Sequence, residues 1–208
     1  MHPDRRTILE GLASASVALG LGACASTKDS GSGAVDGTDG TDGTDGTDGT
    51  DGTDGTVEDC ETATDQLGPF YTEDAPEVSA LADDDEPGTR ILITGTLVDA
   101  ADCRTPRAGW VIDLWHADDA GEYDNVGYNL RGRVTTGEDG GFVVETILPG
   151  EYPERPVRHI HFKIWRADGT EALVSQLYFD GPHYNPDVHP GPLVPLDSAG
   201  NGTVLLAV

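Results

Sequence analysis

The sequence predicts an all-β fold, an antiparallel β-sandwich that forms a single domain. Short apolar runs of strand length recur between clusters of Gly, Pro and Asp, and no long stretch keeps a helical period without a Gly or Pro interrupting it. The spacing of these runs is typical of two packed antiparallel sheets. The expected strands are residues 91–98, 110–115, 141–148, 159–165, 172–179 and 203–208.

The first 23 residues have the layout of an export signal. Arg5 and Arg6 precede an apolar run, 8–21, that is too short to span a bilayer stably. The four residues that end at Cys24, Leu-Gly-Ala-Cys, resemble a bacterial lipobox and predict lipidation of Cys24. The paired arginines resemble a twin-arginine signal, and an ordinary signal peptide with an incidental Cys24 is the alternative. We expect an exported protein, either a cell-envelope lipoprotein or extracellular, that contacts the membrane only through a lipid on Cys24.

Residues 24–56 are expected to form a flexible tether. They are almost entirely Gly, Ser, Thr and Asp, with seven consecutive Asp-Gly-Thr triplets, and so few apolar groups cannot offset the entropy of ordering. Aspartate at every third position does not reproduce the ligand spacing of a calcium loop. The folded domain is therefore expected at 57–208.

The charge of the chain excludes one class of partner. The formal net charge is −26 at pH 7, and a surface this acidic repels phosphate backbones. The sequence therefore argues against binding to nucleic acid.

The cysteines are expected to form one disulfide. With Cys24 assigned to the lipid, Cys60 and Cys103 remain as a pair. In an exported protein such a pair favours a disulfide over a metal site. Two separate buried thiols are the alternative.

A metal site is predicted around the segment Arg-His-Ile-His-Phe-Lys-Ile, 158–164. In a strand, His159 and His161 lie on one face, roughly 7 Å apart, while the apolar residues between and after them occupy the other face. Two tyrosines, Tyr123 and Tyr152, precede them. Two phenolates and two imidazoles favour a hard, oxidised metal such as iron(III). Zinc or copper bound by the histidines, as in a hydrolase or an oxidase, remains an alternative.

Five segments in a fixed order resemble a known family. They are GPFY at 68–71, DLWHADDAGEY at 113–123, LRGRVTTGEDGGFVVETILPGEYP at 130–153, RHIHFKI at 158–164 and LVSQLYFDG at 173–181. Together they resemble the intradiol ring-cleavage dioxygenases, non-haem iron(III) enzymes that open catechols between their two hydroxyls. The resemblance implies a two-sheet core with the metal at one edge.

The resemblance also implies a set of ligands. The iron(III) ligands would be Tyr123, Tyr152, His159 and His161. Tyr152 would be the ligand that leaves when the substrate binds, and its phenolate could then take a catechol proton.

Two further residues are implied near the reacting groups. The family commonly has an arginine three residues before the first histidine, where this chain has Pro156. Arg155 and Arg158 flank that position, and strand parity favours Arg155. Gln176 matches a glutamine that helps position substrate and dioxygen.

The expected activity follows from the resemblance. A small catechol-like aromatic diol and O₂ would be converted to a cis,cis-muconate type of diacid. The alternative is a non-catalytic, tethered β-sandwich that retains the fold and binds a partner, and the displaced arginine favours it. A serine hydrolase is disfavoured because no G-x-S-x-G motif occurs in the folded part. His116, at a strand end, is expected to be structural.

Overall fold

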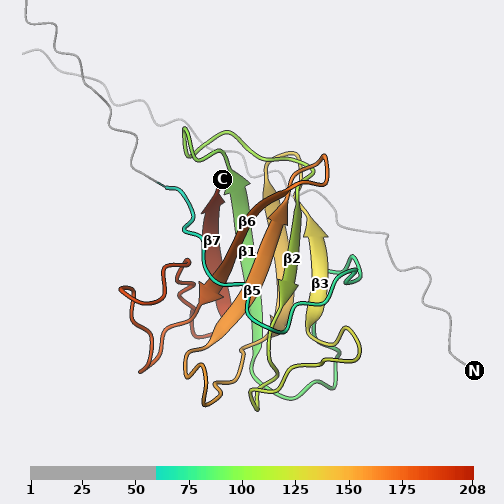
Figure 1. Cartoon of the computed structure of the whole chain (residues 1–208), viewed down its shortest axis with the longest axis vertical. Helices are drawn as coiled ribbons and strands as arrows, with labels where there is room; N and C mark the ends of the chain where they lie inside the picture. The colour runs from blue at the N-terminus through green and yellow to red at the C-terminus, as the bar shows by residue number, and fades with distance from the viewer. Residues whose placement is uncertain (1–59) are drawn as a thin grey trace, which may run out of the picture. The chain divides into compact units, whose positions relative to one another are not determined.

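The computed structural model describes residues 60–208. The expected signal, tether and lipidation site at Cys24 lie outside the described residues. Seven strands form two sheets, with strand orders β4-β1-β7 and β3-β2-β5-β6 (Figure 1). The strands are β1 (Arg90–Val98), β2 (Val111–Trp115), β3 (Arg131–Thr135), β4 (Gly141–Ile147), β5 (His159–Trp165), β6 (Glu171–Tyr178) and β7 (Asn201–Ala207). The predicted all-β sandwich is confirmed. Nothing in this part of the chain is a helix long and apolar enough to cross a membrane.

The strand pairing differs from the expectation in two places. Pairs within the sheets are antiparallel except for β1 and β7, which run parallel. The strand β3 was not expected, because its sequence, Arg-Gly-Arg-Val-Thr, offers one apolar side chain. Its first residue, Arg131, is only 2% exposed. Its burial therefore depends on contacts with distant parts of the chain rather than on an apolar pattern.

The hydrophobic core lies between the two sheets. Ile160, Phe162 and Ile164 of β5 are completely buried there, and Ile93 of β1 and Val144 of β4 face them from the other sheet. This confirms the predicted parity of β5. The odd-numbered side chains of β5, including both histidines, consequently lie on the outer face of the four-stranded sheet.

The segment 60–77, here called the strap, covers that outer face. A disulfide between Cys60 and Cys103 fixes its start, with an S–S distance of 2.12 Å. The amide of Thr62 then donates to Ala207 of β7, and the amide of Asp65 donates to Val174 of β6, both at 3.0 Å. In Figure 1 the strap is the teal segment that crosses in front of the sheet.

The second half of the strap is held by polar side chains of β2 and β3. Arg131 donates to the carbonyl of Phe70 at 2.7 Å, and Tyr71 donates through its hydroxyl to Asp113 at 2.9 Å. At the far end of the strap, the carbonyl of Pro76 accepts a hydrogen bond from the amide of Arg133 at 2.8 Å. The strap thus covers part of the outer face of the four-stranded sheet, and Asp113 and Arg131 are buried beneath it.

Candidate metal centre

Four aromatic donors meet at one end of β5. His159 and His161 extend from the strand, Tyr123 comes from the β2–β3 loop, and Tyr152 comes from the β4–β5 loop. Their rings form a closed circuit, with centroid distances of 5.9 Å for Tyr123–Tyr152, 5.9 Å for Tyr152–His159, 4.8 Å for His159–His161 and 6.3 Å for His161–Tyr123. Residues separated by as many as 38 positions are thereby placed around one point.

The orientation of His159 leaves one nitrogen free to bind a cation. Its Nδ1 lies 2.7 Å from the carbonyl of Val157. A carbonyl only accepts hydrogen bonds, so Nδ1 carries the proton and Nε2 keeps its lone pair. That Nε2 lies 3.4 Å from the hydroxyl of Tyr123. A backbone carbonyl that orients a histidine in this way is a common support for a metal ligand.

Burial keeps both histidines neutral. It lowers the pKa of His159 to about 4. It also lowers the pKa of His161 to about 2, with smaller contributions from the neighbouring His159 and from Arg155. Metal ligation requires a deprotonated imidazole. Both side chains are therefore in the required state at neutral pH without displacing a proton.

The tyrosine Tyr123 needs a cation to ionise. Burial raises its pKa, and the neighbouring phenol of Tyr152 raises it further, while Arg155 and Arg131 act in the opposite direction. A buried phenolate without compensating charge is unfavourable. A trivalent metal ion would supply that charge.

The donor set fits iron(III) better than zinc. Phenolate oxygen and imidazole nitrogen are ligands for a hard, oxidised metal. A group of three or more His, Cys, Asp or Glu side chains able to hold a metal does not occur within 60–208. The two histidines therefore lack the third carboxylate or thiolate that a zinc site usually has. The thiols of Cys60 and Cys103 are joined in the disulfide.

Two of the four donors are stacked against other aromatic side chains. Phe70 of the strap stacks on Tyr123, with centroids 4.3 Å apart and an interplanar angle of 19°. The indole of Trp115 stacks on His161 at 5.1 Å and 5°; these two residues are direct cross-strand partners on β2 and β5. Aromatic contacts of this kind restrict the rings that they cover.

The two candidate arginines lie in different places. Arg155 reaches β6, where its Nη2 donates to Gln176 Oε1 at 2.7 Å and to the Tyr178 hydroxyl at 2.8 Å. Arg158 instead donates to the carbonyl of Pro149 at 2.8 Å and lies 3.9 Å from Glu151. Of the two residues that the sequence offered, Arg155 is the one beside Gln176.

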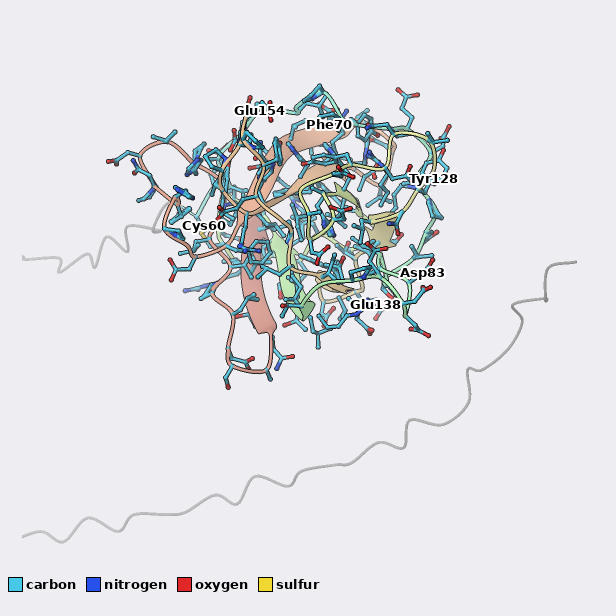
Figure 2. All side chains as sticks on the ribbon, turned by 90° about the horizontal axis from the view of Figure 1, so that it is seen from below. Cys60, Phe70, Asp83, Tyr128, Glu138 and Glu154 are labelled. Atoms are coloured by element: carbon cyan, nitrogen blue, oxygen red, sulfur yellow. A yellow bond between two sulfur atoms is a disulfide. The ribbon has the colours of Figure 1, made fainter. Side chains whose placement is uncertain are left out.

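The strap and the β4–β5 loop approach the same region. Phe70 marks the strap and Glu154 the turn between Tyr152 and Arg155; both lie on one side of the domain in Figure 2, opposite Glu138 in the β3–β4 turn. The turn is closed by a hydrogen bond from the amide of Arg155 to the carbonyl of Tyr152 at 2.9 Å. One tight turn therefore presents both a candidate ligand and a candidate catalytic cation.

Other residues of the region were missed or have structural roles. Tyr178, completely buried, follows Gln176 by two positions on the same face of β6, and strand parity could have indicated it. Asp65 bonds to Tyr178 from the strap, and no local pattern points to it. His116 is buried between the carbonyl of Ala117 and the hydroxyl of Thr146, both at 2.7 Å, as expected for a structural histidine.

Comparison with known proteins places the chain in a family of dioxygenases. A family model described as Dioxygenase matches residues 67–189, and the chain belongs to the intradiol ring-cleavage dioxygenase family. It is 35% identical over 147 residues to chlorocatechol 1,2-dioxygenase of Rhodococcus opacus, covering 56% of each chain. It is 34% identical to hydroxyquinol 1,2-dioxygenase of a Rhizobium species, covering 58% of this chain and 49% of that relative. The chain thus spans about half the length of these relatives.

Two solved structures extend the comparison to the fold. The dioxygenase domain of a dioxygenase and carbohydrate-binding protein fusion from Streptomyces sp. SirexAA-E has a TM-score of 0.63 at 35% identity, covering 71% of this chain and 97% of that one. The 3-chlorocatechol 1,2-dioxygenase of Rhodococcus opacus has a TM-score of 0.59 at 28% identity, covering 71% and 72%.

Proposed function

We propose that the protein is a non-haem iron(III) intradiol dioxygenase that cleaves a catechol-like aromatic diol with O₂ to a cis,cis-muconate type of diacid. The observation that carries the proposal is the closed circuit of Tyr123, Tyr152, His159 and His161. Membership of the dioxygenase family supports the same reaction.

The four donors would have different roles as metal ligands. When bound, iron(III) supplies a Lewis acid that holds the diol as a catecholate and makes its ring reactive toward O₂. His159 and His161 would bind it as neutral imidazoles. Tyr123 is stacked on Phe70 and lies beside His159 Nε2, which suits a ligand that stays in place.

Tyr152 would be the ligand that also moves a proton. It sits in the turn that ends at Arg155, and its ring meets Tyr123 and His159 without a stacked neighbour. Its phenolate oxygen would accept a proton from a catechol hydroxyl as the diol binds. The Arg155 guanidinium would stabilise negative charge on the substrate, and the Gln176 side chain would help to position it.

The proposed substrate is a neutral catechol. The relatives named above are a chlorocatechol and a hydroxyquinol dioxygenase, and neither named compound has a carboxylate. The net charge of −26 would slow the approach of anionic aromatics at low ionic strength.

We also propose that the chain is exported and anchored through a lipid on Cys24. The signal-like pattern of the first 23 residues supports export, and the disulfide suits an oxidising compartment. Membrane fractionation and mass spectrometry of Cys24→Ser against wild type would test it. Release of the variant into the soluble fraction is expected, and an unlipidated Cys24 in the wild type would overturn the anchor.

The proposed reaction can be tested by the colour of the purified protein. Two phenolates on iron(III) should give a red-brown charge-transfer band, and anaerobic addition of catechol should shift it as a catecholate replaces one of them. Adding O₂ should then yield the ring-opened diacid. A protein that stays colourless after reconstitution with iron would overturn the proposal.

The non-catalytic alternative loses its main support in the structure. It was favoured by the arginine displaced from its usual position, but Arg155 still reaches Gln176. Substituting Tyr123 by Phe separates the two functions, because an enzyme should lose iron or rate and a binding module should keep its partner.

A further inference from the structure

We propose that Asp65 and Tyr178 are positioning residues that hold the Arg155 guanidinium, and through it the Gln176 amide, in the orientation that the reaction needs. This inference rests on the proposed function of the metal centre. It assigns a role to a residue of the strap and to a buried tyrosine that is not among the four candidate ligands.

The Tyr178 hydroxyl has a defined direction of hydrogen bonding. It lies 2.5 Å from Asp65 Oδ2, 2.8 Å from Arg155 Nη2 and 3.0 Å from Gln176 Oε1. An ionised carboxylate only accepts and a guanidinium only donates. The single phenolic proton therefore points to Asp65 at the shortest distance, and the lone pairs of the oxygen face Arg155.

The Gln176 amide is fixed in the same way. Its Oε1 accepts from Arg155 Nη2 at 2.7 Å, and its Nε2 donates to the carbonyl of Gln66 at 2.8 Å. A flipped amide would place an N–H group against a guanidinium and an oxygen against a carbonyl. Two consecutive strap residues, Asp65 and Gln66, thus set the orientation of both side chains.

The network holds the Arg155 side chain through the hydrogen bonds of one nitrogen, Nη2. Both of its side-chain hydrogen bonds use Nη2, and its Nε is buried without a partner among residues 60–208. Gln176 and Tyr178 are 0% exposed, so water does not compete for these bonds. The N–H groups on Nη1 remain available to an anionic ligand, and their direction is set by the two hydrogen bonds of Nη2.

Removing only the hydroxyl of Tyr178 separates positioning from packing. The ring contacts His159 and His189, with centroids 6.2 Å and 4.9 Å away, and these contacts survive in Tyr178→Phe. Tyr128→Phe is a control for the loss of a phenolic hydroxyl, because the Tyr128 hydroxyl donates to the carbonyl of Glu73, outside this network.

The experiment is a double-mutant cycle on the iron-loaded full-length protein, using Tyr178→Phe, Arg155→Met and the double variant, with Asp65→Asn beside them. The readouts are iron content, the dissociation constant of 4-nitrocatechol from its visible spectrum, and kcat and KM for catechol. Tyr178→Phe should keep its iron and lose roughly 10-fold in kcat/KM; Asp65→Asn should lose less. In the Arg155→Met background, Tyr178→Phe should change kcat/KM and 4-nitrocatechol binding by less than about 2-fold.

Multiplicative losses in the double variant would overturn the inference, because Tyr178 would then act independently of Arg155. Loss of iron from Tyr178→Phe would also overturn it, since the hydroxyl would then support the metal site itself. The same cycle on the unfolding of the metal-free protein should show non-additive changes, and additive changes there would overturn the inference without reference to iron. Failure of the wild type to bind iron would instead identify a failure of the proposed function.

Discussion

The backbone of Gly68 lies directly against the imidazole of His161. A Cβ atom at this glycine would be 3.0 Å from His161 Cε1 and 3.4 Å from Nε2, and the residue has a φ of +72°. The strap therefore touches a candidate metal ligand through bare backbone, in a conformation that favours glycine.

Substituting Gly68 by Ala should harm the site more than backbone strain alone would. The positive φ should cost about 1 kcal/mol in the free energy of unfolding, and contact with His161 should add to that loss and lower iron content. Gly169→Ala is the matched control, since its φ is +82° and, apart from its two chain neighbours, no described residue has an atom within 4 Å of the place that its Cβ would take. Urea unfolding and iron analysis of both variants measure the difference. Equal losses of stability with full iron content in both would contradict the role of the contact.

The two tyrosines should differ when each is changed to Phe. Tyr123→Phe should lose most of its bound iron and its charge-transfer band, because the proposed ligand that stays in place throughout the reaction is removed. Tyr152→Phe should keep iron and still bind catechol, but kcat should fall by roughly 100-fold as the proton acceptor is lost. Iron analysis, visible spectra and steady-state rates measure both. Wild-type turnover by Tyr152→Phe would show that the proton goes elsewhere.

The stability of the metal-free protein should fall steeply in mild acid. Burial lowers the pKa of His116 and His159 to about 4 and that of His161 to about 2, whereas each titrates near 6.5 in the unfolded chain. Between these values only the unfolded state binds the proton, so stability present above about pH 7 is lost as the pH falls. We expect a loss on the order of 2 kcal/mol for each histidine between about pH 7 and pH 5.

Urea unfolding of the metal-free protein at a series of pH values measures this loss. Burial raises the pKa of Asp113, which makes an opposing contribution, so a single-histidine variant is the cleaner comparison. His116→Gln removes one titrating group away from the candidate ligands and should flatten the pH dependence. An unchanged slope in that variant would contradict the assignment.

Replacing both cysteines by Ser should loosen the strap. The disulfide joins residues 43 positions apart, and its loss should lower the free energy of unfolding by about 4 kcal/mol on the chain-entropy model. Because Asp65 follows Cys60 closely, we also expect weaker 4-nitrocatechol binding in the double variant. Urea unfolding and ligand titration measure the two effects. Unchanged ligand binding would show that hydrogen bonds alone hold the strap.

Much of the fold could be predicted because its signals are local. The strand β5 alternates between core and outer face, so its apolar residues and its histidines separate by parity alone. The strand β3 could not be predicted from an apolar pattern. Its buried Arg131 is instead held by hydrogen bonds to the carbonyls of Phe70 and Asp124, which lie outside the strand. The parallel pairing of β1 with β7 joins the first and last strands, which no short pattern reports.

The residues of the candidate site also differ in whether a local sequence pattern indicates them. The candidate ligands were indicated by ordered motifs, and the choice of Arg155 over Arg158 followed from strand parity. The bond between Asp65 and Tyr178 joins residues 113 positions apart, so no spacing in the sequence indicates it. The stacking of Phe70 on Tyr123 is equally non-local, although both residues lie in recognisable motifs.

The disulfide at the start of the strap links the residues around the candidate metal centre to the redox state of the cysteines. Asp65, Gln66 and Gly68, which contact Tyr178, Gln176 and His161, all belong to the segment that begins at Cys60. A disulfide persists where thiols are oxidised. A newly made chain in a reducing compartment would hold these residues by non-covalent contacts alone. In an oxidising environment, the disulfide would complete the attachment of these three residues beside the candidate metal centre.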